Sequence, residues 1–115
     1  MKWTVEWLER YTVLRFEGEL MVGAAQFFET GVMPWLKMPF APIILDLSTV
    51  TIIASAGLGS LLRIQSAASE ASVHLVLVKP TQEAWQALTM TRLDTLLPCA
   101  DTVEAAVELI ASRSS

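Results

Sequence analysis

The sequence predicts an α/β fold in a single domain, and three observations support this prediction. The chain has 115 residues, 53% of them hydrophobic and 17% charged, which provides one core and is too short for two ordinary domains. Two nearly unbroken apolar runs, residues 43–47 and 73–78, are typical of strands covered on both faces. Between them, apolar residues recur at helical spacing over residues 58–68. Together these segments predict a right-handed βαβ unit.

The first segment of the chain predicts a β-hairpin. Trp3, Val5 and Trp7 alternate with polar residues, so we expect them on the inward face of a half-buried strand. The run 12–16 predicts the second strand, which we expect Gly18 to end. The two tryptophans are therefore interpreted as core residues.

A helix is predicted over residues 24–37, where apolar residues again recur near helical spacing. Gly31 and Pro34 should weaken or kink its second half. Residues 39–42 begin and end with proline and are expected to form a short linker before the first apolar run.

The last third of the chain predicts two more helices. One begins after Pro80, with Thr81 as its N-cap and Trp85 on its buried stripe. The other has Asp101 or Thr102 as its N-cap. Between them, residues 96–97 form a short strand at best.

Charge and composition argue against several classes of partner and cofactor. Eight Lys and Arg against twelve Asp and Glu give a net charge of -4, which opposes nucleic-acid binding. One cysteine, Cys99, and one histidine, His74, cannot form a disulfide or a zinc site, so no metal or other cofactor is expected. The most apolar window, residues 43–62, contains Asp46 and five Ser or Thr residues, which argues against a membrane span. With no secretory signal at the start of the sequence, we expect a cytoplasmic protein.

A catalytic role is not expected. Ser55 has Gly57 at one position of a G-x-S-x-G nucleophile elbow, but Ile53 occupies the other glycine position. His74 falls within an apolar run, where it is interpreted as a strand residue rather than a general base.

Residues 46–61 are the most informative stretch, because a strand there passes into a helix through a serine and two glycines. We expect Ser55 at or just before the N-cap, with its hydroxyl near free backbone N–H groups. A phosphate at this position would meet the positive end of the helix dipole, and Gly57 and Gly59 would let a partner approach closely. The alternative interpretation is that Ser55 simply caps the helix.

Short motifs occur along the chain at residues 18–20, 44–48, 55–59, 75–78, 93–94 and 102–106. Their order and spacing resemble the STAS domain family, and within it the single-domain bacterial anti-sigma factor antagonists. The resemblance covers nearly the whole chain, as residues 1–112, with 113–115 expected to form a disordered tail.

The resemblance implies a mixed β-sheet of about four to five strands, with helices packed mainly on one face. It also implies partner switching, in which the unphosphorylated protein binds an anti-sigma factor that is also a serine kinase, and phosphorylation of one serine breaks the complex. The phosphoacceptor would be Ser55. The expected partner-binding residues are Met21, Ala54, Ser55, Ala56, Gly57, Leu58, Gly59 and Arg63.

Two departures from the family pattern leave a second role open. Ala54 and Met21 stand where the family usually has Asp, so the charge near Ser55 should be less negative than usual. A STAS accessory or scaffold subunit that is not phosphorylated, in a stress-sensing assembly or beside a lipid-transport ATPase, fits this difference equally well. The high apolar fraction and an acidic edge also permit a weak homodimer.

Overall fold

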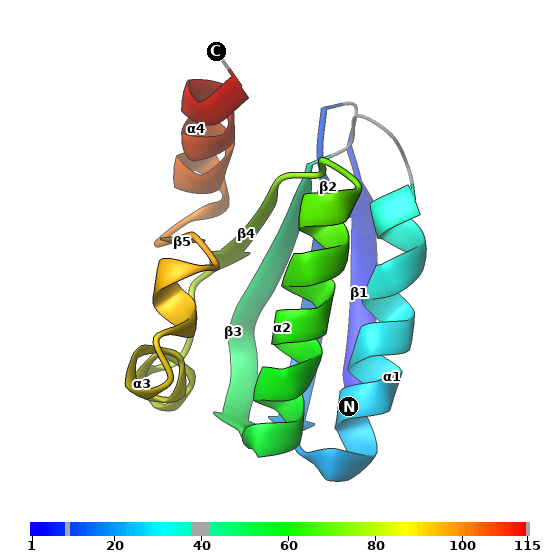
Figure 1. Cartoon of the computed structure of the whole chain (residues 1–115), viewed down its shortest axis with the longest axis vertical. Coiled ribbons are helices and arrows are strands. Elements are labelled where there is room, and N and C mark those ends of the chain that lie inside the picture. The colour runs from blue at the N-terminus through cyan, green and yellow to red at the C-terminus, as the bar shows by residue number, and fades with distance from the viewer. Residues whose placement is uncertain (9, 38–41, 115) are drawn as a thin grey trace.

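The computed structural model describes residues 1–8, 10–37 and 42–114, without the side chains of 113 and 114, and the chain forms one five-stranded sheet (Figure 1). The strands follow sequence order across the sheet: β1 (Lys2–Trp7), β2 (Thr12–Leu20), β3 (Ile43–Ile53), β4 (Leu75–Val78) and β5 (Cys99–Ala100). β1 is antiparallel to β2, and the remaining neighbours are parallel. The predicted α/β class and mixed sheet are confirmed.

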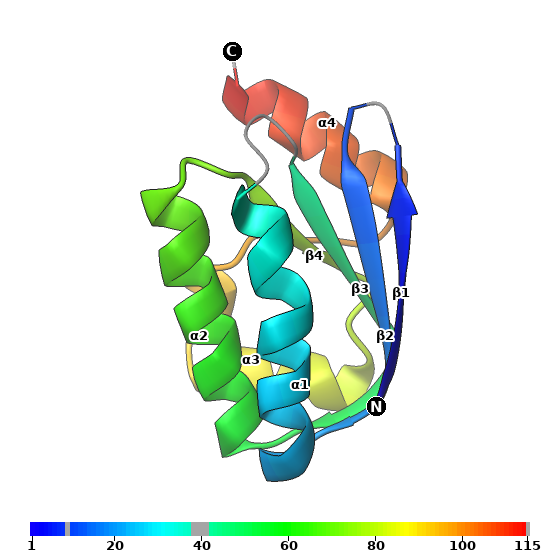
Figure 2. The same ribbon diagram turned by 90° about the vertical axis from the view of Figure 1, so that its right-hand side faces the viewer.

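Three helices connect the parallel strands and contribute to the larger core. They are α1 (Val22–Val32), α2 (Ser55–Glu70) and α3 (Gln82–Met90). Figure 2 shows α1 and α2 side by side on one face of the sheet. The core under these helices contains fully buried aromatic and branched side chains: Leu14, Phe16, Phe28, Leu45, Leu47, Leu61, Ile64 and Leu88.

The last helix, α4 (Val103–Ser114), covers the opposite face (Figure 2). It packs Ala106 and Ile110 against Val13, Ile44 and Val76, which form a second, smaller core. The helices thus lie mainly, but not wholly, on one face of the sheet. The backbone of residues 113 and 114 continues α4, and residue 115 lies outside the described residues.

Both predicted threonine caps are present. The Thr81 hydroxyl accepts a hydrogen bond from the Ala84 amide (3.2 Å) and donates one to the Val50 carbonyl (2.8 Å), which ties α3 to β3. The Thr102 hydroxyl accepts from the Ala105 amide (3.0 Å), so Thr102 rather than Asp101 caps α4.

The strands differ from the prediction at three places. Gly18 does not end β2, because a positive φ of 123° and a register shift against β3 let the strand continue to Leu20. β3 continues past the apolar run to Ile53. The short final strand is Cys99–Ala100, after a 3-10 helix η2 (Leu93–Thr95), and not residues 96–97.

Two tryptophans expected in the core are exposed. Trp7 is 67% exposed and meets Trp35 edge-on at 6.1 Å, because it is the last residue of β1, which lies at the edge of the sheet. Trp85 is 42% exposed, because it lies beside the buried stripe that Ala84 and Leu88 form in α3. Trp3 does pack on the core, stacked on Phe16 at 6.1 Å.

The predicted 24–37 helix is two helical segments. α1 ends at Val32 and a 3-10 helix, η1 (Met33–Lys37), follows it. Pro34 is the second residue of η1, where its missing N–H is incompatible with continued α-helix. Most of the predicted linker, residues 39–41, lies outside the described residues. No described helix has the length and apolar character needed to cross a bilayer.

Candidate functional site

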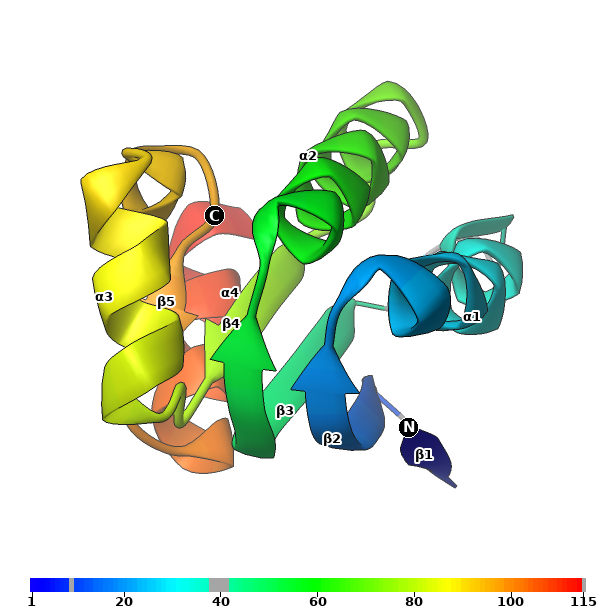
Figure 3. The ribbon, with the colours of Figure 1, turned by 90° about the horizontal axis from the view of Figure 1, so that it is seen from below.

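The site lies where β2 and β3 pass into helices. α1 follows β2 after Met21, and α2 follows β3 after Ala54, so both helices begin at the same end of the sheet (Figure 3). The Ala54 amide donates to the Leu20 carbonyl (2.9 Å), which holds the two strand ends together. The sequence region singled out around Ser55 is therefore joined to the region around Met21.

Ser55 is the first residue of α2 and not its N-cap. Ala54 takes the cap position with an extended backbone (φ -90°, ψ 176°), and no side chain caps this helix. The side chain of Ser55 is exposed, and its hydroxyl makes no hydrogen bond within the described residues. The interpretation of Ser55 as a helix cap is therefore wrong. Its hydroxyl is available at a helix end where backbone N–H groups are unpaired.

The two glycines have different roles. Gly57 is buried, and a Cβ there would lie 2.6 Å from Leu20 Cγ and 2.8 Å from the Leu20 carbonyl oxygen. Its missing side chain lets α2 approach the end of β2, so it does not face a partner as we expected. Gly59 is partly exposed, and its nearest neighbour would be Arg63 Nη1 at 3.5 Å. The Arg63 side chain therefore runs back along α2 past Gly59, toward the helix start.

Polar contacts hold α1 and α2 together beside this start. The Ser60 hydroxyl donates to the Ala25 carbonyl (3.1 Å) and accepts from Arg63 (3.3 Å). Arg63 also pairs with Glu29 of α1 through Nε and Oε1 at 2.6 Å. Because the Glu29 carboxylate is paired with the Arg63 guanidinium, it is not an unpaired negative charge near Ser55.

A shallow groove between the two helices combines these features. Its lining includes residues of both helices: Val22, Ala25, Gln26, Glu29, Ser55, Ala56, Gly59 and Arg63. Met21 (45% exposed) and Val22 (81% exposed) add apolar surface at the same end. We call this groove, with Met21, the α1–α2 face. Leu58, an expected partner-binding residue, is half-buried and packs against the core.

Four residues of the α1–α2 face were not predicted: Val22, Ala25, Gln26 and Glu29. The start of α1 was predicted at residue 24, which left Val22 outside the helix. The exposed, uncovered position of a valine is visible only once α1 and α2 are placed side by side. Glu29 could not be distinguished from the other acidic residues in the sequence, because its partner Arg63 is 34 residues away and no local pattern links the two.

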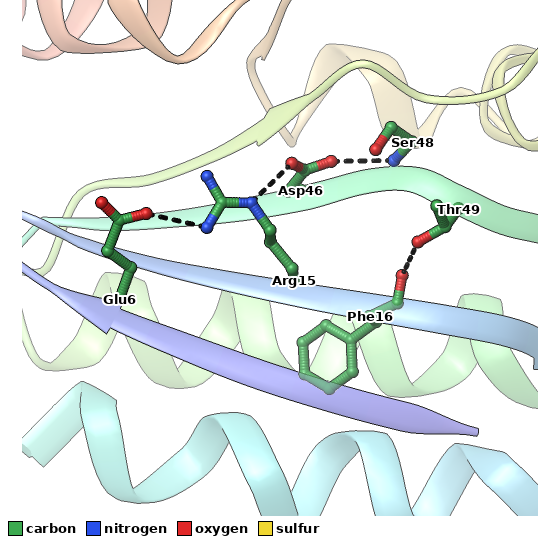
Figure 4. A network of polar contacts seen from close by, with 6 residues as sticks. All are labelled: Glu6, Arg15, Phe16, Asp46, Ser48 and Thr49. Atoms are coloured by element: carbon green, nitrogen blue, oxygen red, sulfur yellow. Dashed lines mark hydrogen bonds and ion pairs between the residues drawn. The ribbon is translucent and has the colours of Figure 1, made fainter.

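A polar network on the opposite face of the sheet accounts for Asp46 (Figure 4). Arg15 donates to Glu6 at 2.8 Å and to Asp46 at 3.2 Å, and Asp46 accepts from the Ser48 amide at 2.9 Å. The hydrogen bond to Glu6, followed by the negative charges of Glu6 and Asp46, raises the pKa of Arg15 above its ordinary value. Asp46 is thus a structural partner, and the described residues contain no group of ligands that could hold a metal ion.

The remaining reactive side chains lie away from Ser55. Cys99 is half-buried, and burial together with the negative charge of Asp94 raises its pKa to about 11. His74 directly precedes β4 and is therefore not the strand residue that we expected, although its carbonyl accepts a hydrogen bond from the Ile43 amide (2.8 Å). Neither residue lines the α1–α2 face.

Comparisons with known proteins agree with this geometry. The family model described as the STAS domain matches residues 2–106. A crystal structure of a candidate anti-sigma factor antagonist from Thermotoga maritima has a TM-score of 0.86 and 26% identity, covering 95% of this chain and 94% of that one. No curated protein matches significantly.

Two more distant structures share the fold. The anti-sigma factor antagonist SpoIIAA in its unphosphorylated form has a TM-score of 0.77 and 18% identity, covering 96% of this chain and 97% of that one. The murine anion transporter Slc26a9 has a TM-score of 0.80 and 15% identity, and the match covers 93% of this chain but 18% of the transporter.

Proposed function

The chain belongs to the STAS domain family, and we propose that it is an anti-sigma factor antagonist whose α1–α2 face binds an anti-sigma factor with serine kinase activity. The observation that carries this proposal is the exposed Ser55 hydroxyl at the start of α2, beside exposed apolar surface from Met21 and Val22. Such a surface suits a protein partner. We propose a non-catalytic, cytoplasmic role.

The apolar part of the face would supply most of the affinity. Val22 and Met21 are exposed although both are large and apolar, and they lie next to a polar rim formed by Gln26, Glu29 and Arg63. An apolar centre with a polar rim is the usual composition of a protein–protein interface. A partner that covers this end of the molecule would also cover the Ser55 hydroxyl.

Phosphorylation of Ser55 would then break the complex. A phosphate adds about two negative charges at neutral pH, and these would have to be desolvated against the partner. The unpaired N–H groups at the start of α2 and the guanidinium of Arg63 would favour the phosphate in the free protein. Both effects act in the same direction, toward the dissociated state.

The missing carboxylates favour an alternative in the same family. Ala54 is half-buried and Met21 is exposed, so neither supplies an acidic group beside Ser55. A kinase that recognises an acidic residue next to its serine would lose that contact. In this alternative the same face docks a scaffold or ATPase subunit and Ser55 is not modified.

The experiment that separates the two roles combines binding with phosphorylation. The chain is incubated with an anti-sigma factor kinase from the same genome and with ATP, and intact mass is measured for the parent, Ser55→Ala and Ser66→Ala. Ser66 is exposed on α2, so it serves as the matched control. We expect one phosphate on the parent and on Ser66→Ala, and none on Ser55→Ala.

Binding is measured in parallel by calorimetry. Val22→Asp should weaken binding, since it places a charge in the apolar part of the face, whereas Ser66→Asp should leave binding unchanged. A kinase that binds tightly but adds no phosphate would support the scaffold alternative. Unchanged binding by Val22→Asp would refute the location of the docking surface.

A further inference from the structure

We propose that two copies of this chain pair through their β1 edges, in an antiparallel arrangement centred on Thr4. β1 is the first strand of the sheet, and no strand pairs with its outer edge in the part of the chain that the structure describes (Figure 3). Its register with β2 runs without a shift from Lys2 to Trp7, and the strand contains no proline. A bulge and a proline are two of the features that keep edge strands from pairing, and β1 has neither; its charged residues, Lys2 and Glu6, are of opposite sign.

The backbone of β1 presents its free hydrogen-bonding groups at its odd-numbered residues. The Leu8 amide donates to the Tyr11 carbonyl at 3.0 Å, so these residues form a hydrogen-bonded pair next to the strand. Bonded and non-bonded pairs alternate along an antiparallel ladder, so the even-numbered residues of β1 bond to β2. The N–H and C=O groups of residues 3, 5 and 7 therefore point outward, where a second strand can use them.

The charges of β1 select one register for two identical strands. Antiparallel pairing centred on Thr4 places Lys2 opposite Glu6 of the second copy, and Glu6 opposite Lys2 of that copy. Shifting the centre to residue 3 or residue 5 removes both opposite-charge pairs. The Thr4-centred register also pairs residue 3 with residue 5, which is the bonded pairing that the outward backbone groups require.

The charged groups on this side of the sheet are already arranged for that pairing. Glu6 is held by Arg15 at 2.8 Å, and Arg15 is held by the buried Asp46 at 3.2 Å (Figure 4). Lys2 lies opposite Glu17 of β2. In the dimer, Lys2 would lie between Glu17 of its own chain and Glu6 of the second copy, so the charges would alternate across the joined sheets.

The other side of β1 supplies apolar surface. The same register places Trp3 against Val5 of the second copy, and Val5 is 41% exposed in the single chain. Trp3 is stacked on Phe16, so its ring is held in place before pairing. Apolar cross-strand pairs of this kind stabilise antiparallel sheets. Both sides of the strand, and its backbone, thus fit a second copy of this chain.

The test uses two charge-reversal variants. Each variant should form a repulsive homodimer, whereas the two variants together should form an attractive heterodimer. Lys2→Glu places a carboxylate opposite Glu6 of the second copy, and Glu6→Lys places an ammonium group opposite Lys2 of the second copy. We expect the dimer dissociation constant of each variant, measured by sedimentation over a concentration series, to rise about tenfold. An equal mixture of the two should restore dimerisation as a heterodimer, because both cross-strand pairs are then attractive.

A cross-link tests the register. Thr4→Cys in a Cys99→Ser background places two thiols in a non-bonded pair about 4.5 Å apart between Cα atoms, within disulfide reach. We expect a covalent dimer under mild oxidation, whereas Ser66→Cys in the same background should give little. The proposal is overturned if the parent chain stays monomeric over the series, if the mixture does not recover dimers, or if Ser66→Cys cross-links as readily as Thr4→Cys.

Discussion

Replacing Gly57 by alanine should destabilise the fold, whereas the same replacement at Gly59 should not. At Gly57 the new Cβ would lie 2.6 Å from Leu20 Cγ and 2.8 Å from the Leu20 carbonyl oxygen. The Leu20 carbonyl oxygen also accepts a hydrogen bond from the Ala54 amide, so it cannot move away from a new Cβ without breaking that hydrogen bond. Overpacking of this kind costs about 1–3 kcal/mol, and contact with backbone favours the upper end.

Gly59→Ala is the matched control, because both glycines lie in the first half of α2 and gain the same helix propensity, about 1 kcal/mol. Beside Gly59, the nearest atom to a new Cβ is the flexible end of Arg63 at 3.5 Å, an ordinary contact. The propensity gain cancels between the two variants. Their difference in free energy of unfolding is therefore the overpacking alone, about 3 kcal/mol.

Urea denaturation followed by far-UV circular dichroism measures this difference directly. Unfolding midpoints at equal m-values report the stability of each variant. If Gly57→Ala is as stable as Gly59→Ala, then α2 does not approach β2 as closely as the structure has it.

Two further predictions concern the caps and Cys99. Thr102→Ala removes one capping hydrogen bond and should cost about 1 kcal/mol of stability. Thr81→Ala should cost more, because the Thr81 hydroxyl makes two hydrogen bonds and its loss also leaves the Val50 carbonyl without this partner. Urea midpoints in the reverse order would contradict this. Burial raises the pKa of Cys99 to about 11 from an ordinary value of 9.0, so its stabilising effect is complete below pH 9 and is lost as pH rises toward 11. Cys99→Ala should therefore lose less stability than the parent between pH 8 and pH 11, as measured by urea denaturation at each pH, and equal losses would contradict the assignment.

The elements that the sequence predicted well are those whose residues are buried on a regular period. The run at 43–47 lies within β3, and the last four residues of the run at 73–78 form β4, because strands covered on both faces leave a continuous apolar signal. The extension of β3 to Ile53 was missed because Ser48, Thr49 and Thr51 are exposed there, where the sheet is not covered on both faces. β-branched residues still favour the extended backbone in that half.

Other differences arise from geometry that no local pattern encodes. Trp7 and Trp3 share a face by alternation, but whether a helix covers that face at the strand end depends on where α1 and η1 stop. The offset of Ser55 from the cap position depends on the backbone of Ala54, which is extended although alanine favours helix. The buried state of Gly57 depends on Leu20, 37 positions earlier in the chain. Each of these requires the tertiary arrangement.

The two proposed surfaces use separate residues, and this makes them independently testable. The α1–α2 face lies at the helix starts, with Ser55 and Val22, whereas the β1 edge uses Lys2, Thr4 and Glu6. Ser55→Asp should therefore weaken partner binding without changing the dimer dissociation constant. Lys2→Glu should raise the dimer dissociation constant without changing partner binding. If Lys2→Glu weakens partner binding as much as dimerisation, pairing and docking are coupled, and the partner binds two chains at once.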